Sequence, residues 1–459
     1  MRRTPDQFPQ PGPLSVMLKR LALFPDTTRV QNDMLTVGGM DLSLLAGEYG
    51  TPLYIYDRAT MDGCAAAYRR ALQAYYPAES EITYAGKAFL CRAVAEWIRE
   101  QDLWADCTGE GETSIAVSAN LPRESILMHG VNKSGADIAF AKQHAGTIVV
   151  DNLTELRTLV RLGTQAEGRP TPGSKGSRSP DVWLRLLPGL AVSTHHSYTQ
   201  TGQQGSKFGM TPEDVSSAAQ ICKHEGLPLN GLHFHQGSNF RDPTPLRAAI
   251  ELALDLVKEI NLGKAWHLCP GGGWSLAYHE NELPQPDIEE YVRLIAQTVV
   301  EKCRSLGLPL PILHLEPGRS LIARAGIAVY RVGVVKRGGD KTWFLIDGGM
   351  ADNPRYVLYG AKYSCLPVTG LSRDLQEQVS IAGPYCESGD VLIEDLPMPQ
   401  VEEGELIAIP ASGAYQLSMS NNYNGARRPA VVWVEGGRAR LVVRRETIEE
   451  LWQRDLSIV

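Results

Sequence analysis

The chain has 459 residues and a formal net charge of -7 at pH 7. This length exceeds the size at which a single hydrophobic core stops growing, so we expect two domains. The mildly acidic balance, without any basic run, argues against nucleic acid or an anionic membrane as the main partner, and no apolar stretch is long enough to span a bilayer.

The N-terminus and the cysteines predict a cytoplasmic protein. After Met1, Arg2 and Arg3 the chain continues into prolines without an apolar segment, unlike a secretory signal. The eight cysteines are scattered and include no Cys-x-x-Cys pair, so we expect mostly reduced thiols rather than a zinc knuckle or a redox site.

The first large part of the chain, from Pro52 to about Ala325, alternates short β-rich runs with helical stretches, which is typical of βα units. We therefore predict an α/β fold with a (β/α)8 barrel over residues 46–325. Its strand candidates are Ile82–Ala85, Thr147–Val150, Val182–Leu186, Leu232–His235, Trp266–Cys269 and Ile312–Glu316.

The part after Ala325 is rich in β-type segments broken by Gly and Pro, which predicts a C-terminal all-β domain resembling a sandwich or barrel. The strand-like segment Met34–Val37 is expected to join it, so the β-domain is predicted to be discontinuous, with residues 1–45 and 326–459. Gly163–Pro180 is predicted to be a flexible surface insertion. The strand candidates of the β-domain are Ile327–Val335, Thr342–Ile346, Leu406–Ile409 and Ala430–Val434.

Lys87 lies where the apolar run Ile82–Ala85 ends and a helical pattern, Cys91–Ile98, begins. In a (β/α)8 barrel this turn belongs to the face that carries the chemistry, and a partly desolvated lysine there can form a Schiff base. The alternative is a solvated surface lysine, which is the commoner fate of any single lysine.

His233 and His235 lie two residues apart on a predicted strand and share one face of it. Such a pair can hold a divalent metal, but a site needs further ligands, and no second cluster is evident in the sequence, so we predict no metal. A structural role in the barrel wall is the alternative for His233. Gly237 and Ser238, which follow, suit an anion site.

Two more turns follow predicted strands. Gly271, Gly272 and Gly273 let backbone N–H groups approach a phosphate, although a plain tight turn is the alternative. Glu316 and Arg319 offer a carboxylate that can face a pyridine nitrogen and a guanidinium that can bind phosphate or carboxylate. A salt-bridged surface turn is the alternative for this pair.

Cys386 lies in a predicted loop between strands, in Pro384-Tyr385-Cys386-Glu387-Ser388-Gly389-Asp390. A buried, inert thiol is the usual state of a cysteine. A thiol can also donate a proton to a carbanion, and a loop suits a functional residue better than a packing residue.

Together and in this order, the motifs resemble the alanine-racemase-like, fold type III pyridoxal-phosphate decarboxylases, and among them the diaminopimelate decarboxylases. The resemblance extends from Leu45 to Pro429 and also includes Gly50–Asp57, Ser206–Gly209 and Gly413–Tyr415. It implies the cofactor pyridoxal 5'-phosphate and the decarboxylation of meso-2,6-diaminopimelate to L-lysine and carbon dioxide.

The resemblance also implies a role for each matching residue. Lys87 would be the Schiff-base lysine, His235 would stack on the cofactor ring, and Glu316 would pair with its pyridine nitrogen. Ser238 and Gly271 to Gly273 would hold the phosphate, while Tyr415 would contact cofactor and substrate. Cys386 would reprotonate the decarboxylated carbon, and with Glu387 it would serve the pocket of the partner subunit in a homodimer with shared active sites.

The predicted substrate is a small amino acid with a distal carboxylate, which requires a cation in the pocket. Arg319, Arg355 and Tyr359 match family positions for that carboxylate, and Glu387 would pair with the distal ammonium group. A decarboxylase of lysine, ornithine or arginine has no use for the two arginines, because the missing carboxylate would leave a buried charge unpaired.

Alternatives remain open. Phe89 and Gln236 depart from the family pattern, so the substrate can also be another amino acid, a carrier-bound glutamate or a carboxylated polyamine in a secondary pathway. A catalytically idle homologue is disfavoured because Lys87 and Cys386 are both present. A metal-dependent hydrolase would have to use His233 and His235.

Overall fold

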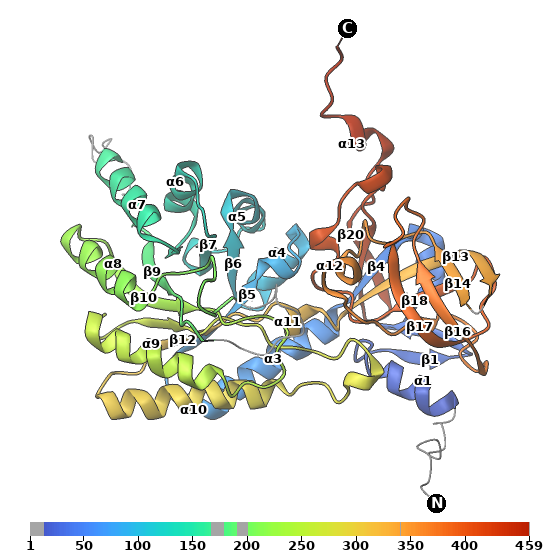
Figure 1. The fold of residues 1–459 in the computed structure, drawn as a ribbon, viewed down its shortest axis with the longest axis horizontal. Coiled ribbons are helices and arrows are strands. Elements are labelled where there is room, and N and C mark those ends of the chain that lie inside the picture. Colours follow the sequence, from blue (N-terminus) through green and yellow to red (C-terminus); the bar gives the residue numbers. More distant parts are fainter. Residues whose placement is uncertain (1–12, 167–178, 191–200, 340, 459) are drawn as a thin grey trace, which may run out of the picture. The chain divides into compact units, whose positions relative to one another are not determined.

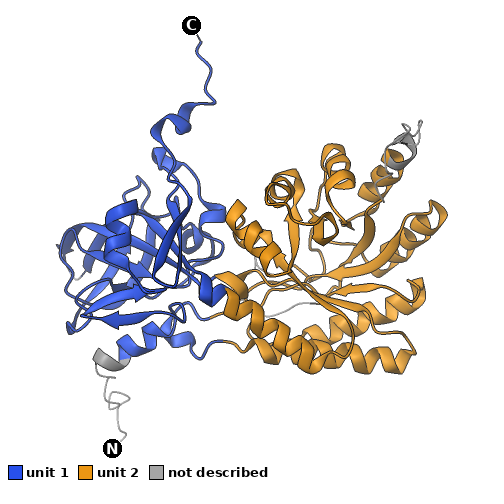
Figure 2. Cartoon of the chain, turned by 180° about the vertical axis from the view of Figure 1, so that it is seen from behind, with its two compact units in different colours: residues 1–61, 277–285, 323–459 blue, residues 62–276, 286–322 orange. Residues whose placement is uncertain are grey.

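The computed structural model describes residues 13–166, 179–190, 201–339 and 341–458. The chain divides into two compact units (Figure 2), which we call the barrel unit and the sheet unit. The barrel unit comprises Asp62–Leu276 and Pro286–Ile322, and the sheet unit comprises Met1–Met61, Ala277–Gln285 and Ala323–Val459.

The barrel unit is built on eight parallel strands that close into a barrel in the order β10-β11-β12-β5-β6-β7-β8-β9 (Figure 1). Short apolar runs such as that of β8, which is buried at all four positions, suit strands covered on both faces. The strands are β5 (Ser80–Ala85), β6 (Trp104–Thr108), β7 (Ile126–His129), β8 (Thr147–Val150), β9 (Asp181–Leu186), β10 (Leu229–Phe234), β11 (His267–Cys269) and β12 (Ile312–Leu315). The predicted (β/α)8 barrel is confirmed.

A helix follows each barrel strand and buries one apolar face. In the helix after β5, for example, Val94, Trp97 and Ile98 are buried, at the spacing of one helical stripe. The helices are α3 (Arg58–Tyr75), α4 (Arg92–Glu100), α5 (Gly109–Ser118), α6 (Gly135–His144), α7 (Leu153–Ala166), α8 (Pro212–His224), α9 (Leu246–Ile260), α10 (Ile288–Leu306) and α11 (Arg319–Ile322). Among the described residues, no helix has the length and apolarity needed to cross a membrane.

The sheet unit is mostly β-structure, as predicted for the C-terminal part. Its main sheet runs β17-β16-β14-β13-β4-β19-β20, with β18 paired to β13 and to β15, and a small sheet is formed by β1, β2 and β3. The strands are β1 (Arg29–Gln31), β2 (Met34–Val37), β3 (Met40–Asp41), β4 (Leu53–Asp57), β13 (Gly326–Gly338), β14 (Lys341–Ile346), β15 (Leu366–Pro367), β16 (Leu375–Ala382), β17 (Val391–Pro399), β18 (Leu406–Ile409), β19 (Ala430–Glu435) and β20 (Arg438–Val443).

One hydrophobic core of the sheet unit joins the two ends of the chain. Leu35 of β2 and Leu53 of β4 pack in one buried cluster with Ile327 of β13 and Val432 of β19. The backbone N–H of Leu35 also donates a hydrogen bond to the carbonyl oxygen of Val368, at 2.8 Å. The helices of this unit are α1 (Pro13–Leu21), α2 (Leu42–Tyr49), α12 (Arg355–Tyr359) and α13 (Ile448–Trp452).

The structure differs from the predicted boundaries at the start of the barrel. Residues 46–61 were assigned to it, but β4 pairs in parallel with β19 and antiparallel with β13, so this segment lies in the sheet unit. The apolar run of β4 is followed by the helix α3, and this local order imitates a βα unit. Of the predicted insertion Gly163–Pro180, residues 163–166 end α7 and 167–178 lie outside the described residues.

Candidate active site

The barrel unit gathers polar side chains at the carboxyl ends of its strands. Lys87 follows β5, Asp106 lies near the end of β6, His129 ends β7, and Glu316 follows β12. Neighbouring registers align these ends, since Ala85 is paired with Asp106 and Thr108 with His129. This is the end of a (β/α)8 barrel at which active sites are built.

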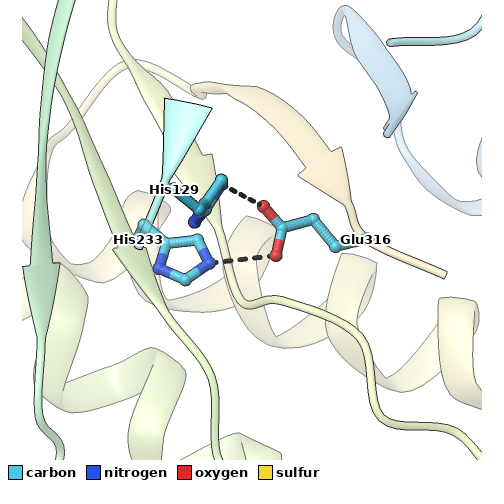
Figure 3. Close-up of side chains that lie close together, drawn as sticks. All are labelled: His129, His233 and Glu316. Carbon is cyan, nitrogen blue, oxygen red and sulfur yellow. Dashed lines mark hydrogen bonds and ion pairs between the residues drawn. The ribbon is translucent and has the colours of Figure 1, made fainter. Parts of the chain in front are cut away.

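Glu316 is the centre of this group (Figure 3). Its Oε2 lies 3.0 Å from Nε2 of His233, and its Oε1 lies 3.2 Å from Nε2 of His129. All three residues are buried. A carboxylate can only accept a hydrogen bond, so Nε2 of His233 carries the hydrogen and donates a hydrogen bond to Glu316.

The electrostatics of the group follow from burial and from these partners. Burial favours the neutral acid, but the two histidines outweigh it and hold the pKa of Glu316 well below its usual range. Burial lowers the pKa of His233 to about 4, although Glu316 opposes this shift. Glu316 is therefore a buried carboxylate, and His233 is a neutral imidazole.

Lys87 is linked to the same group through Asp106. Its amine Nζ donates a hydrogen bond to Oδ2 of Asp106 at 3.2 Å, and Oδ1 of Asp106 lies 3.8 Å from Nε2 of His129. The Lys87 side chain is 49% exposed, whereas that of Asp106 is buried. The amine is thus held at the end of the barrel and remains accessible.

His235 lies just beyond the end of β10, beside the glycine turn. Its Nδ1 accepts a hydrogen bond from the backbone N–H of Gly272 at 3.3 Å. Burial first, and then the charges of Lys87 and Arg185, hold the pKa of His235 well below its usual value. The ring is therefore neutral, and a neutral flat ring suits stacking on a cofactor.

The glycine turn requires glycine for two reasons. Gly271 and Gly273 have φ angles of 76° and 103°, which residues with a side chain rarely adopt. A Cβ at Gly272 would lie only 1.9 Å from the carbonyl oxygen of Glu316. Close by in the fold, Arg319 donates a hydrogen bond from Nη2 to Oγ of Ser238 at 3.0 Å, so a hydroxyl and a cation stand together.

The polar residues at the carboxyl ends of the barrel strands, which we call the barrel group, fit pyridoxal phosphate. This is the cofactor that the sequence resemblance implies. Among the described residues no group meets the buried Oε1 of Glu316 in hydrogen-bond geometry, although Nε2 of His129 lies 3.2 Å away, so this oxygen can accept a hydrogen bond from the N–H of a pyridine ring. Lys87 supplies an accessible amine for the aldehyde. Ser238, Arg319 and the glycine turn supply the donors that a phosphate requires.

The remaining predicted residues lie in the sheet unit. Cys386 and Glu387 are exposed and lie in the loop between β16 and β17. Asp390 anchors this loop by accepting a hydrogen bond from the backbone N–H of Tyr385 at 2.9 Å, and Asn424 accepts one from the N–H of Cys386 at 2.9 Å. The thiol is thus presented on a loop that is held at its base.

Arg355, at the start of α12, is buried. Its Nη1 donates a hydrogen bond to the hydroxyl of Tyr363 at 2.8 Å, and its guanidinium lies 4.6 Å from the ring centre of Tyr278. Burial disfavours the charge, but the two tyrosines outweigh it and raise the pKa of Arg355. Tyr359 is half-buried and ends the same helix.

Tyr415 is half-buried and has a φ angle of 58°, which is unusual for a residue with a side chain. Strained residues of this kind cluster at ligand sites, where the surrounding structure holds them. The preceding Gly413 helps to fix the segment, because its carbonyl oxygen accepts a hydrogen bond from the hydroxyl of Tyr56 at 2.9 Å.

Sequence reasoning missed Asp106 and His129, and with them a possible donor set. The sequence offered no further metal ligand for His233, but the structure brings His129 and Glu316 to it, with ligand atoms of the three residues within 4.8 Å of one another. The position of His129 at the end of a barrel strand was the available signal. A single histidine in the sequence is too common for that signal to stand out.

Comparison with known proteins identifies the family to which this chain is similar. The family model described as "Pyridoxal-dependent decarboxylase, pyridoxal binding domain" matches residues 63–323. The chain is similar to the diaminopimelate decarboxylase of Bacillus subtilis, at 39% identity over 93% of this chain and 96% of that protein. It is also similar to that of Actinosynnema pretiosum, at 36% identity over 95% of each chain.

A solved structure supports the same assignment. The diaminopimelate decarboxylase from M. jannaschii in complex with L-lysine matches with a TM-score of 0.86 and 28% identity, over 94% of this chain and 98% of that one. The barrel group, the family match and the full-length similarity agree. The chain therefore belongs to the diaminopimelate decarboxylases, within the pyridoxal-dependent decarboxylases.

Proposed function

We propose that this protein converts meso-2,6-diaminopimelate to L-lysine and carbon dioxide with pyridoxal phosphate, in the cytoplasm. The observation that carries the proposal is the gathering of Lys87 and Glu316 at one end of the barrel, in a chain that matches diaminopimelate decarboxylases over nearly its whole length. The L-lysine in the M. jannaschii complex has the structure of the expected product.

In the barrel unit, each residue has a distinct task. When bound, pyridoxal phosphate accepts the electron pair that the departing carboxylate leaves behind. Lys87 provides the amine that carries the cofactor, and Glu316 provides a permanent negative charge for its ring nitrogen. His235 offers a neutral face for the ring. The phosphate would be held by Ser238, Arg319 and the turn Gly271 to Gly273.

The sheet unit provides the proton donor. Sγ of Cys386 delivers a proton to the carbon that has lost carbon dioxide, and the exposed loop that carries it extends into the site of a second copy of the chain. The active enzyme is then a homodimer with shared active sites. Glu387, on the same loop, pairs with the distal ammonium group of the substrate.

The distal carboxylate of the substrate selects for diaminopimelate. Arg355, fixed by Tyr363 and Tyr278, offers a buried guanidinium, and Tyr359, Tyr415 and Arg319 complete the polar surroundings of the substrate. A substrate without the carboxylate leaves Arg355 buried without a counter-charge, which is strongly unfavourable. Discrimination of this kind reaches several orders of magnitude when a site is built to pair with a missing group.

The test is release of L-lysine from meso-diaminopimelate by the purified protein with added pyridoxal phosphate, with lysine, ornithine and arginine as parallel substrates. We expect product from diaminopimelate alone. Lys87→Ala should abolish both turnover and the absorption band of lysine-bound cofactor. Turnover of another substrate, or a cofactor band without any turnover of diaminopimelate, would contradict the proposal and favour a decarboxylase of a secondary pathway.

A further inference from the structure

The group in Figure 3 contains more than the predicted cofactor residue, because two neighbouring imidazoles face one carboxylate, each at a different oxygen. We propose that His129 and His233 are positioning residues that hold Glu316 as a charged carboxylate, and that His129 connects it to the Asp106–Lys87 pair. The inference rests on the proposed role of Glu316 at the ring nitrogen of the cofactor. It assigns a task to two residues that do not themselves touch the reacting atoms.

His233 acts as a neutral hydrogen-bond donor. It is 1% exposed, and its Nε2 donates to Oε2 of Glu316 at 3.0 Å. Because its Nδ1 has no partner among the described residues, a second proton on the ring would be buried without an acceptor. The ring therefore keeps one proton, and that proton points at the carboxylate. The contact fixes both the orientation and the charge of Glu316.

His129 lies beside His233, with ring centres 4.8 Å apart, and faces the other oxygen of the carboxylate. Its Nε2 lies 3.2 Å from Oε1 of Glu316 and 3.8 Å from Oδ1 of Asp106, so one nitrogen stands between two carboxylates. The other oxygen of Asp106 accepts the hydrogen bond from Lys87. The four residues form a continuous chain of charged and polar contacts from the Schiff-base position to the ring-nitrogen position.

Without the imidazoles, Glu316 would behave as an isolated buried acid. Burial alone raises the pKa of a carboxyl group, by several units in the extreme case. Here the opposite shift is present, and the two histidines are its causes. Besides the two histidines, the ionisable groups that interact electrostatically with Glu316 are Arg185, His235, Cys269 and His314, and Asp106 lies next to His129.

The arrangement has a functional consequence. A carboxylate with a low pKa stays charged over the whole working pH range, so it can keep a ring nitrogen protonated and make the ring a good electron acceptor. If an imidazole is removed, the pKa of Glu316 rises and the charge becomes dependent on pH. The histidines thus remove a pH dependence that burial would otherwise impose.

The test uses His129→Asn and His233→Asn in the cofactor-bound protein, with His267→Asn as the matched control. His267 is another histidine of the barrel interior, but its Nδ1 lies 2.9 Å from Nε2 of His314 rather than beside Glu316. The absorption spectrum of the bound cofactor is recorded as a function of pH. We expect the first two variants to gain a spectral transition that is shifted upward by about two pH units relative to any such transition in the wild type.

Glu316→Gln supplies the reference for the neutral side chain. At low pH the spectra of both histidine variants should approach that of Glu316→Gln, and the new transition should vanish in the His129→Asn/Glu316→Gln double variant. A transition that persists in the double variant, or that also appears in His267→Asn, would overturn the assignment.

A cofactor-free measurement separates this inference from the proposed function. The NMR titration of the His233 ring in the cofactor-free protein should shift to still lower pH in Glu316→Gln, because Glu316 favours the charged imidazole. An unchanged titration would refute the triad even in a working enzyme. Failure of the wild type to bind pyridoxal phosphate would instead refute the proposed function. Tight zinc binding that is lost in His129→Asn would show that the three residues are metal ligands.

Discussion

The pKa values of two buried carboxyl groups in this protein are shifted in opposite directions, and the neighbouring residues explain why. Glu316 faces two neighbouring imidazoles and is held as a carboxylate. Asp352, in the sheet unit, accepts hydrogen bonds from the hydroxyls of Tyr54 and Tyr330 and from the N–H of Gly349, and burial raises its pKa to about 6. The neutral donors at Asp352 do not offset its loss of hydration, whereas at Glu316 a charge interaction with His129 adds to the hydrogen bond from His233.

Asp352 therefore makes stability depend on pH. Its pKa is about 6 in the folded protein, above the ordinary value of 3.8, so the folded state binds the proton more tightly. The resulting stabilisation is complete below the unfolded pKa and is lost as the pH rises through the folded pKa. Relative to Asp352→Asn, whose side chain does not titrate, the wild type should lose about 3 kcal/mol of unfolding free energy between about pH 4 and pH 7.

Thermal or urea unfolding of both proteins across that pH range is the measurement. Both tyrosine hydroxyls donate to Oδ2 of Asp352, so an amide NH2 in its place changes both hydrogen bonds, and this adds a constant offset between the two curves. The result is the pH dependence of the difference in unfolding free energy between the two proteins. Parallel curves would mean that Asp352 does not titrate in this range.

For single residues, the sequence was sufficient to identify those that directly follow a predicted strand and lie in an unusual local sequence. Lys87 and Glu316 were found because each follows an apolar run and stands in a distinctive turn. His129 was not found, since its partners come from β10 and β12, which are distant in sequence. The neighbours of His129 in the sequence, Met128 and Gly130, give no indication that a carboxylate lies close to it in the fold.

Among the elements, the loop between β16 and β17 has a chemically distinct thiol. Cys386 is exposed, whereas the other seven cysteines, all in the described part of the chain, are buried or half-buried. Burial raises the pKa of Cys222 and Cys365 to about 12, so these thiols stay protonated and unreactive. Among the thiols of the protein, that of Cys386 on this loop should therefore be the most reactive toward alkylating reagents.

We expect one equivalent of iodoacetamide to modify Cys386 in the native enzyme and to abolish decarboxylation. Peptide mass analysis identifies the modified residue, and the loss of activity should follow its extent. Cys386→Ser should be resistant to further inactivation and should show a kcat reduced by about 100-fold, because the hydroxyl is a much weaker acid. Full activity of the alkylated protein would exclude Cys386 as the proton donor.

The elements were predicted with uneven success, for a physical reason. Thr147–Val150 and Met34–Val37 were placed with the bounds of β8 and β2, since short apolar runs bounded by turn residues are a local signal. The partner of a strand is not a local property. The assignment of β4 to the barrel failed because its neighbours in the sheet, β13 and β19, follow the whole barrel in sequence.

For the whole molecule, the proposed homodimer makes each active site depend on two chains. Lys87→Ala and Cys386→Ala are each expected to be inactive alone. If the chains exchange after mixing, half of the dimers combine the two variants, and in each of these one of the two sites has both residues intact. Activity should therefore recover to about one quarter of the wild-type value.

The measurement is specific activity after the two variants are mixed at equal concentration and the subunits are allowed to exchange. Co-expression of the two chains is the alternative when exchange is slow. A mixture of Lys87→Ala with wild type that only dilutes activity serves as the control. Mixed variants that stay inactive despite exchange would show that Lys87 and Cys386 serve the same site from one chain.

The position of β4 has a consequence for how the chain is made. All five of its residues are buried, and it lies in the sheet between β13 and β19, which are synthesised after the barrel. At ordinary translation rates, roughly 20 to 75 seconds pass between the emergence of β4 and that of β19. Until β13 emerges this apolar strand has no partner on either edge, and until β19 emerges one edge stays unpaired. Nascent chains of this protein should therefore depend on chaperones until the last strands leave the ribosome.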